Sequence, residues 1–406
     1  MHTLLKSRAE DPLAARRLGL DSDPVSTPPR GLSTRLRQQL LYMHVSSFDW
    51  QDGGLLTPIK FLDRDSIEYS LCRAAGKDRN EERMARISLH KGMELVDRHD
   101  GGIYQFATHN DWRHSHYSKT LAAQAGCLRL YALAHALFGE ADFRTTAEGI
   151  HAYLRDRVFT AAGVFRSMSG QTVVRPATRE RRAEQASTVI RTRENGWVIE
   201  ALACFHEFCG AASALDMALS AASWICTKRN ADAGGFSKDE GDQSSACLAD
   251  HLAMARAFLQ LYRASADRQY LCRAEDTANF ICERYSNTSG GFNSTAGETG
   301  ANPVPQVDEN ICLSRFLNLL HHYSGNDRYL AQARHGLAYL ARPEVATARI
   351  EEAGILLLDE ELASTPLTIT IAGHSEDSRT RRLREAALRH FGWYKVIHCH
   401  PPQGSA

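Results

Sequence analysis

Three histidines precede a long helical pattern in residues 101–119, whose sequence is GGIYQFATHNDWRHSHYSK. They are His109, His114 and His116. Because an unperturbed imidazole pKa of about 6.5 suits proton transfer near neutral pH, His116, at the expected helix start, is a candidate general base. The alternative is that His116 only braces the helix start. The three histidines could also ligate a metal, but their spacing lacks the regularity of a helix-borne site, so we predict none.

The pair Asp250-His251 lies near the start of another predicted helix. In a two-histidine isomerase one base removes the proton beside a carbonyl and a second group returns it. His251 could act with His116 in this way, with Asp250 as the orienting carboxylate. The alternatives are a half-buried histidine and a helix-capping aspartate. Glycoside hydrolysis instead needs two carboxyls facing one bond, which Asp250 with Asp308 or Glu309 could supply.

Further candidates are aromatic, amide and charged side chains in the segments that precede predicted helices. Aromatic rings stack on the CH faces of sugars and polar groups bind hydroxyls, so we expect a pocket for a polyhydroxylated ligand without a cofactor. The candidate substrate-binding residues are Lys60, Tyr104, Trp112, Lys119, Asn195, Trp197, Asp308, Glu309 and Asn310.

Glycine breaks divide the chain into pairs of helical patterns. They fall near Gly53, Gly101, Gly163, Gly234 and Gly290, roughly 50 to 70 residues apart, a spacing typical of helical-hairpin repeats. The first and last helices could pair as a sixth hairpin. This pattern predicts an all-α fold, an (α/α)6 toroid in which the inner-helix N-termini meet at one mouth. The predicted helices are 32–44, 65–76, 81–97, 117–138, 141–159, 195–209, 212–229, 246–264, 267–285, 308–323, 327–341 and 344–358.

The pattern changes at both ends of the expected toroid. Residues 1–30 mix charges with prolines and predict an N-terminal arm. The toroid is expected over residues 31–362. Residues 363–406 contain a strand, a helix and another strand, which predicts a small β-α-β appendage. The Arg-rich stretch 175–193 is expected to be a solvated loop, with a lid for an anionic substrate as the alternative.

The composition limits the classes of partner. Lysine plus arginine and aspartate plus glutamate each number 48, so no basic field attracts nucleic acid or a membrane surface. No apolar run reaches the ~20 residues needed to span a bilayer. We therefore expect a cytoplasmic protein whose partner is a small polar substrate, with a protein partner as the alternative. The ten cysteines mostly lie in helical patterns, where thiols behave as small buried hydrophobes rather than disulfides.

Several segments in order resemble the helical part of the spermatogenesis-associated protein 20 family, whose members are thioredoxin-domain-containing proteins. They are GGIYQFATHNDW with HYSK, TRENGWVIEALACF, ACLADHLAMARAFLQLY, GGFNST, DENICLSRFLNLLHHYSGNDRYL and LTITIAGHSEDSRTRRLREAALRHF. The resemblance covers residues 47–400. It implies the toroid and kinship of shape with N-acylglucosamine 2-epimerases and six-hairpin glycosidases.

Within this resemblance, five candidate residues match the family pattern: His116, Lys119, Asn195, Asp250 and Asn310. The sequence also departs from it. Family carboxylates are replaced at Ser118 and Ala249, His109 and His251 are off pattern, and no thioredoxin-like domain stands in the residues before 47.

Three functions are compatible with these patterns. The first is an isomerase or epimerase acting on a sugar-like or other polar hydroxylated carbonyl compound, with His116 and His251 as acid/base residues. The second is a non-catalytic toroid that binds a glycan or a protein. The third is metal-dependent chemistry on a specialised metabolite, or glycoside hydrolysis.

Overall fold

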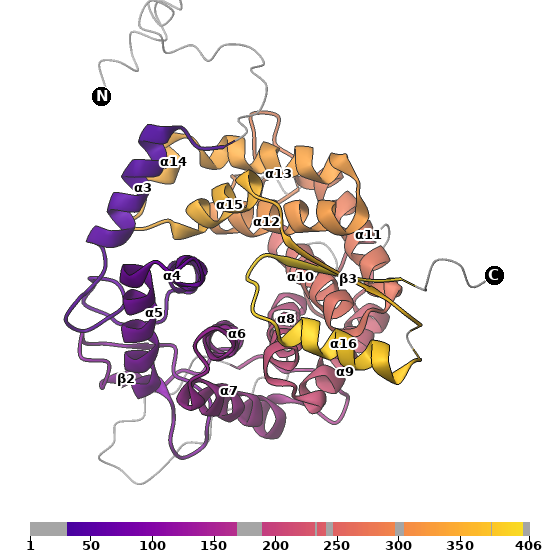
Figure 1. Cartoon of the computed structure of the whole chain (residues 1–406), viewed down its shortest axis with the longest axis horizontal. Coiled ribbons are helices and arrows are strands. Elements are labelled where there is room, and N and C mark those ends of the chain that lie inside the picture. Colours follow the sequence, from indigo (N-terminus) through magenta and orange to yellow (C-terminus); the bar gives the residue numbers. More distant parts are fainter. Residues whose placement is uncertain are drawn as a thin grey trace, which may run out of the picture.

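The chain forms a ring of paired helices, an (α/α)6 toroid, in the computed structural model (Figure 1). The structure describes residues 31–168, 189–231, 234–240, 247–296, 304–374 and 376–400. The inner helices that surround the axis are α4 (Arg64–Ala75), α6 (Leu121–Phe138), α8 (Thr192–Cys209), α10 (Leu248–Ser265), α12 (Val307–Ser324) and α15 (Ala353–Ala363). The outer helices are α3 (Thr34–Ser46), α5 (Arg79–Gly92), α7 (Ala141–Tyr153), α9 (Ala212–Lys228), α11 (Arg268–Tyr285) and α13 (Asp327–Leu340).

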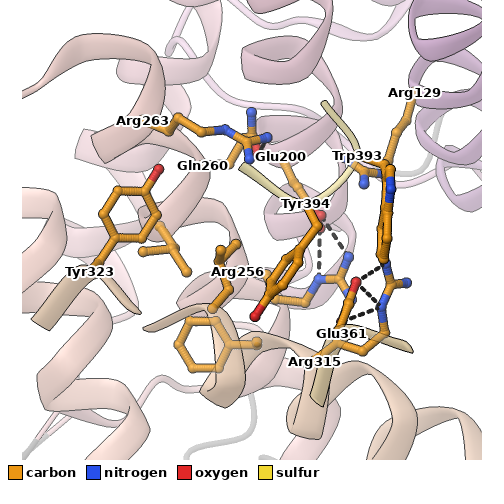
Figure 2. Close-up of a pocket in the computed structure, with 13 residues that line it drawn as sticks. Arg129, Glu200, Arg256, Gln260, Arg263, Arg315, Tyr323, Glu361, Trp393 and Tyr394 are labelled. Carbon is orange, nitrogen blue, oxygen red and sulfur yellow. Dashed lines mark hydrogen bonds and ion pairs between the residues drawn. The ribbon is translucent and has the colours of Figure 1, made fainter. Parts of the chain in front are cut away.

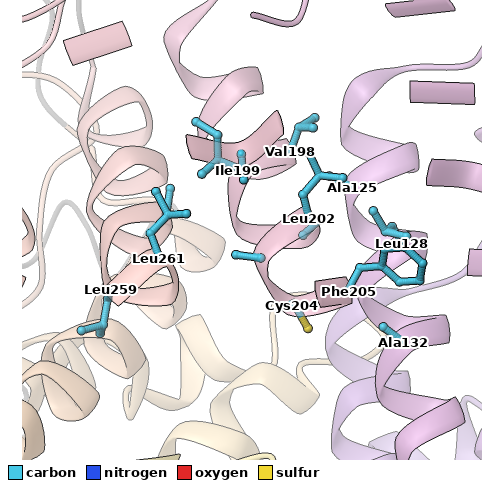
Figure 3. Packing of buried hydrophobic residues seen from close by; sticks show 14 of the residues in the cluster. Ala125, Leu128, Ala132, Val198, Ile199, Leu202, Cys204, Phe205, Leu259 and Leu261 are labelled. Atoms are coloured by element: carbon cyan, nitrogen blue, oxygen red, sulfur yellow. The ribbon is translucent and has the colours of Figure 1, made fainter. Parts of the chain in front are cut away.

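The apolar patterns of the helices explain their places in the ring. An outer helix such as α11 buries one stripe, whereas inner helices such as α8 and α10 bury residues around most of their circumference. Figure 3 shows this packing, in which Leu128 of α6, Phe205 of α8 and Leu261 of α10 belong to one continuous core. The sequence of an inner helix is therefore mostly apolar, even though one of its faces borders the axis.

The sixth hairpin joins the two ends of the toroid. Leu36 and Leu40 of α3 pack with Leu356 of α15 in one buried cluster, and the Leu32 backbone N–H donates to Asp359 Oδ1 at 2.8 Å. The pairing follows the sequence-based expectation, but the last inner helix begins later than predicted. Pro343–Ala346 forms only the short helix α14, and the following segment is non-helical up to Ala353.

Short β-bridged turns connect the outer helices α5, α7, α9 and α11 to the next inner helix. Bridges join Val96 to Ile103, Phe159 to Phe165, Asn230 to Phe236 and Ser286 to Phe292. Gly102 shows why glycine is needed: its φ is +72°, and a Cβ there would lie 2.7 Å from the Tyr153 ring. Between α5 and α6, β1 (Phe106–Ala107) also pairs antiparallel with β2 (Ser115–His116).

The C-terminal residues add a small β-α-β unit on one side of the ring, as expected (Figure 1). Strands β3 (Leu367–Ala372) and β4 (Lys395–His400) pair in parallel, with α16 (Ser378–Arg389) between them in sequence. The Arg384 guanidinium donates to the carbonyls of Arg263 and Ala264 at the end of α10. The unit is thereby fastened to the end of the ring that lies opposite the inner-helix N-termini.

The sequence predicts no membrane span. One described helix is nevertheless long and apolar enough to cross a membrane. It is α6. This helix is an inner member of the ring, packed between α4 and α8. Core helices of globular folds pass the same criterion, so this match is weak evidence for a span.

Candidate functional site

The N-terminal halves of the inner helices enclose a cavity of about 480 Å³ on the ring axis. Small residues on α6 and α10 create the space. Ala122 and Gly126 line it from α6, and Ala249 and Ala253 from α10. A Cβ built on Gly126 meets nothing within 4 Å. A volume of this size is in the range of small-molecule sites.

Carboxylates gather on the side of the cavity formed by α4 and α12. Asp308 and Glu309 are the second and third residues of α12. Asp63 caps α4 by accepting the Ser66 N–H at 2.9 Å, and Asp65 follows it in the first turn. These four residues form the acidic wall of the cavity.

Two arginines hold part of the acidic wall in ion pairs. Arg349, from the non-helical segment before α15, binds Asp308 through Nη1 at 2.6 Å. Arg64 binds Asp65 through Nε at 3.0 Å. No residue in the described part of the chain forms such an ion pair with the other two carboxyls. The Ser294 hydroxyl donates to Glu309 Oε2 at 2.5 Å.

Asp63 and Glu309 have raised pKa values. Burial raises the pKa of Asp63 to about 7, and the negative charges of Glu351 and Asp65 add to the shift. Burial also raises the pKa of Glu309, with Asp308 and Asp250 contributing repulsion. The cavity therefore offers two carboxyls with raised pKa values, that of Asp63 being about 7, beside two that are ion-paired.

Aromatic rings line other parts of the cavity. Trp197 of α8 lines it together with Phe61 and Tyr104. The Arg193 guanidinium lies 5.2 Å from the Trp197 ring centroid, and the Lys119 ammonium lies 5.4 Å from that of Tyr104. Aromatic faces beside carboxyls are a combination that suits a polyhydroxylated ligand.

Charged side chains form the floor. Arg129, Glu200 and Arg256 line its deep end. Each is the ninth residue of its inner helix, so each lies about 12 Å along the axis from the helix start at 1.5 Å per residue. Arg256 binds Glu200 in a bidentate ion pair with distances of 3.0 and 2.7 Å. Burial alone would raise the Glu200 pKa, but the attraction of Arg256 outweighs it and lowers the pKa to about 2.

Sequence reasoning missed this floor and also missed His44. The available signal was a lone charge in an apolar helix, as in CLRLYALA for Arg129 and LAMARAFL for Arg256. A buried lone charge is costly unless it is paired. His44 lies buried between Glu81 and Glu351, at 3.1 and 3.0 Å, and its partner Glu351 adjoins the acidic wall.

Of the predicted substrate-binding residues, Tyr104, Trp197, Asp308 and Glu309 line the cavity. Their contact with a ligand stays a prediction. The other predicted site residues do not line it, and most have structural partners.

Asn195, Asn310 and His251 hold the turns in place. Each is the fourth residue of an inner helix. The Phe165 N–H donates to Asn195 Oδ1 at 3.0 Å, and the Phe292 N–H to Asn310 Oδ1 at 2.7 Å. Both amide groups also donate to the carbonyl of the same phenylalanine. These side chains satisfy buried backbone groups that would otherwise be unpaired. They do not line the cavity, and their contact with a ligand stays a prediction.

His251 makes the corresponding contact in its own turn. Its Nδ1 accepts the Phe236 N–H at 3.1 Å, and its Nε2 lies 3.0 Å from the Tyr285 hydroxyl. Burial lowers the His251 pKa to about 4, so the ring is neutral at pH 7. Both ring nitrogens are engaged and the side chain is 2% exposed. His251 therefore does not line the cavity, and its role as an acid/base residue stays a prediction.

The predicted lysines and one tryptophan are also structural. Lys60 donates to Asp49 at 2.7 Å and to the carbonyls of Gly53 and Leu55. Lys119 repeats this arrangement with Asp97 and the Gly101 carbonyl. Trp112 is fully buried, and its indole N–H donates to the Asp52 carbonyl. Burial of these side chains under the turns explains why they do not reach the cavity.

Asp250 and His116 also lie off the cavity lining. Asp250 accepts the Cys247 N–H at 3.1 Å, which is the capping alternative. His116 stacks on Phe106 with ring centroids 4.6 Å apart, and no partner binds its buried Nδ1 among the described residues.

No group of three or more metal-binding side chains occurs in the part of the chain that the structure describes. The predicted Arg-rich loop lies mostly outside that part, as does the predicted N-terminal arm.

Comparisons with known proteins support the fold. No protein-family model matches the chain, and no curated protein matches it. Among solved structures, the chain is similar to a cellobiose 2-epimerase from Bacillus thermoamylovorans, with a TM-score of 0.61 and 11% identity over 75% of this chain and 85% of that chain. A D-mannose isomerase has a TM-score of 0.61 and 14% identity over 77% and 86%. A GH76 alpha-mannanase from Bacteroides thetaiotaomicron has 0.59 and 11% over 75% and 83%.

The chain thus shares the toroid of epimerases, isomerases and six-hairpin glycosidases. At these identities the likeness shows the fold alone. Membership of the spermatogenesis-associated protein 20 family stays a prediction, since no comparison supports it.

Proposed function

We propose that the protein is a carbohydrate-active enzyme that uses the acidic wall of the cavity for acid–base chemistry. Glycoside hydrolysis is the reaction that this wall supports best. The supporting observation is that two carboxyls with raised pKa values, Asp63 and Glu309, lie in the same wall as the ion-paired Asp65 and Asp308. Hydrolysis of a glycosidic bond needs one carboxyl that donates a proton and another that activates water or attacks the sugar.

In this proposal Glu309 or Asp63 protonates the leaving-group oxygen, and Asp308 or Asp65 acts from the other side of the bond. Trp197 and Tyr104 supply stacking surfaces for the sugar rings. The ligand is bound in a cavity whose walls come from several helices. Its hydroxyls are within the reach of carboxylates and guanidinium groups.

Isomerisation or epimerisation is the second candidate function. Two of the similar folds carry those activities by name, and a carboxyl with a pKa of about 7, as at Asp63, suits proton removal near neutral pH. The base in this version is a cavity carboxyl rather than His251. His116 remains a candidate only if a ligand extends beyond the cavity toward β2.

A substrate panel tests the proposal. Purified protein is incubated with aryl glycosides, neutral disaccharides and aldoses, and products are followed by proton NMR. We expect glycoside cleavage that Glu309→Gln lowers by about 10²- to 10⁴-fold, the usual contribution of a general acid. The matched control is Glu94→Gln, since Glu94 is an exposed carboxylate outside the cavity. It should retain wild-type activity.

The same assay separates the alternatives. Conversion of an aldose with deuterium uptake, without cleavage, would favour the isomerase. Saturable sugar binding without turnover would favour a non-catalytic toroid. Cleavage that is equal in wild type, Glu309→Gln and Asp63→Asn would contradict acid–base catalysis by this wall.

A further inference from the structure

A second, smaller cavity lies on the ring axis beyond the floor. Its volume is about 70 Å³. It shares Arg129, Glu200 and Arg256 with the larger cavity. Trp393 and Tyr394, which directly precede β4, border it on another side (Figure 2). We call it the axial chamber. Its size corresponds to roughly two water molecules at about 30 Å³ each.

Arginines dominate the lining of the axial chamber. Arg129, Arg256, Arg263 and Arg315 line it, against the two carboxylates Glu200 and Glu361. Each of those carboxylates is already occupied by one arginine. Glu200 binds Arg256, and Glu361 accepts from Arg315 Nε and Nη2 at 2.8 to 3.1 Å.

The remaining cations share their carboxylates. Glu68 is bound by Arg129 at 3.1 Å and by Arg315 at 2.8 Å. Glu207 is bound by Arg263 at 3.0 Å and by Lys395 at 2.9 Å. Among the described residues this ion-pair network holds five cations and four carboxylates in three groups. Arg129 and Arg315 balance Glu68 and Glu361, and Arg256 balances Glu200. The excess of one positive charge therefore lies with Arg263 and Lys395, which share Glu207. The cations are Arg129, Arg256, Arg263, Arg315 and Lys395, and the carboxylates are Glu68, Glu200, Glu207 and Glu361.

Loss of a proton does not remove this excess. Arginine stays protonated in proteins. Lys395 is fully buried and lies within 3.1 Å of the carbonyls of Ala387, Leu388 and His390 as well as Glu207. Burial lowers the pKa of Lys395, but these four acceptors favour the ammonium form, since a neutral amine has only two hydrogens to donate. A buried positive charge without a counter-charge is costly.

We infer that the axial chamber binds a monovalent inorganic anion such as chloride. The anion balances the excess charge and accepts from guanidinium groups whose donors the protein leaves unused. Arg129 Nε is buried and has no hydrogen-bond partner among the described residues. Arg256 donates to Glu200 through Nε and Nη2, and no described residue accepts a hydrogen bond from its Nη1. The inference stands on the network alone and does not depend on what binds in the larger cavity.

Anion-dependent stability tests this site in the full-length protein. Thermal unfolding is measured in sodium chloride and in sodium gluconate at equal ionic strength, because gluconate is too large for a chamber of this volume. We expect saturable stabilisation by chloride. At ten times the dissociation constant the folding equilibrium constant should rise about 11-fold, as ligand linkage requires. Identical unfolding midpoints in the two salts would overturn the proposal.

Variants locate the effect. Arg263→Met leaves Glu207 paired with Lys395 alone, which removes the excess charge, and should remove the difference between chloride and gluconate. Arg113→Met replaces an exposed arginine outside the network and should keep the difference. A chloride effect that survives in Arg263→Met would show that the anion binds elsewhere, against the proposal.

Crystals grown or soaked in sodium bromide decide the question even if Arg263→Met does not fold. Anomalous scattering should show one bromide peak in the axial chamber, near the Arg129 and Arg256 guanidinium groups. Water density without an anomalous peak there at saturating bromide would overturn the assignment.

Discussion

Glu309 and Asn310 are neighbours on α12, yet they serve different regions of the molecule. Glu309 lines the cavity, whereas Asn310 is fully buried and holds the preceding turn. The same contrast separates the fourth and ninth residues of the inner helices. Gln124, Asn195, His251 and Asn310 bind turn backbones, while Arg129, Glu200, Arg256, Arg315 and Glu361 face the axis.

The comparison teaches that polar residues beside the glycine turns have two unrelated causes. A turn that is buried at a ring junction needs side chains for its backbone N–H and C=O groups. A cavity needs groups that face a ligand. Both demands fall on the first turns of the same helices, so residue type and spacing do not distinguish them. One helical residue changes the direction of a side chain by about 100°.

The largest effect on stability should come from Asn310→Ala. Truncation leaves the Phe292 N–H and C=O without their partner, and each unsatisfied buried group costs about 2 kcal/mol, or about 4 kcal/mol together. Denaturant unfolding measures this loss, with the exposed Asn80→Ala as the control. Catalytic activity per folded molecule should not change. A stable Asn310→Ala protein that has lost its activity would instead place Asn310 in the ligand site and break the comparison.

Two buried histidines should make the free energy of unfolding depend on pH in opposite directions. Each effect should be somewhat smaller than that of Asn310→Ala. Hydrogen bonds and charge from Glu351 and Glu81 outweigh burial and raise the His44 pKa to about 9. Its stabilising contribution is therefore complete below pH 6.5 and is lost as the pH rises through 9, on the order of 3 kcal/mol in total. His251, whose pKa is lowered by burial to about 4, stabilises above pH 6.5 and loses that contribution as the pH falls through 4.

NMR titration of the imidazole ring signals measures both values. At pH 7.5 His44 should be charged and His251 neutral. Titration of both rings near pH 6.5 would mean that neither is held by the partners described above.

The smallest effect should come from His251→Asn. Asparagine is the residue that holds the Phe165 and Phe292 turns, so the variant can still accept the Phe236 N–H. Loss of the contact with Tyr285 should cost about 1 kcal/mol at pH 7. The acid loss of stability between pH 6.5 and 4 should become weaker than in wild type. A large loss of activity at pH 7 with normal stability would restore His251 as a catalytic candidate.

Much of the fold was predictable from the chain. Glycine turns and apolar periods placed most helices within a few residues, because backbone strain and burial leave local signals. The last inner helix was the exception. Residues 347–352 were predicted as helix, but Arg349 and Glu351 instead bind Asp308 and His44 from other parts of the ring. Such long-range partners leave no periodic signal.

The sequence by itself determined the repeat of hairpins, the turns between them and the gathering of inner-helix N-termini at one mouth. Only the tertiary structure decided which polar side chains face the axis. Asp308 and Glu309 do so, whereas Lys119 and Asn195 turn toward backbone groups. The reason is physical: periodicity reports how often a residue is buried, but the direction of a side chain depends on how a helix is rotated against neighbours that are distant in the chain.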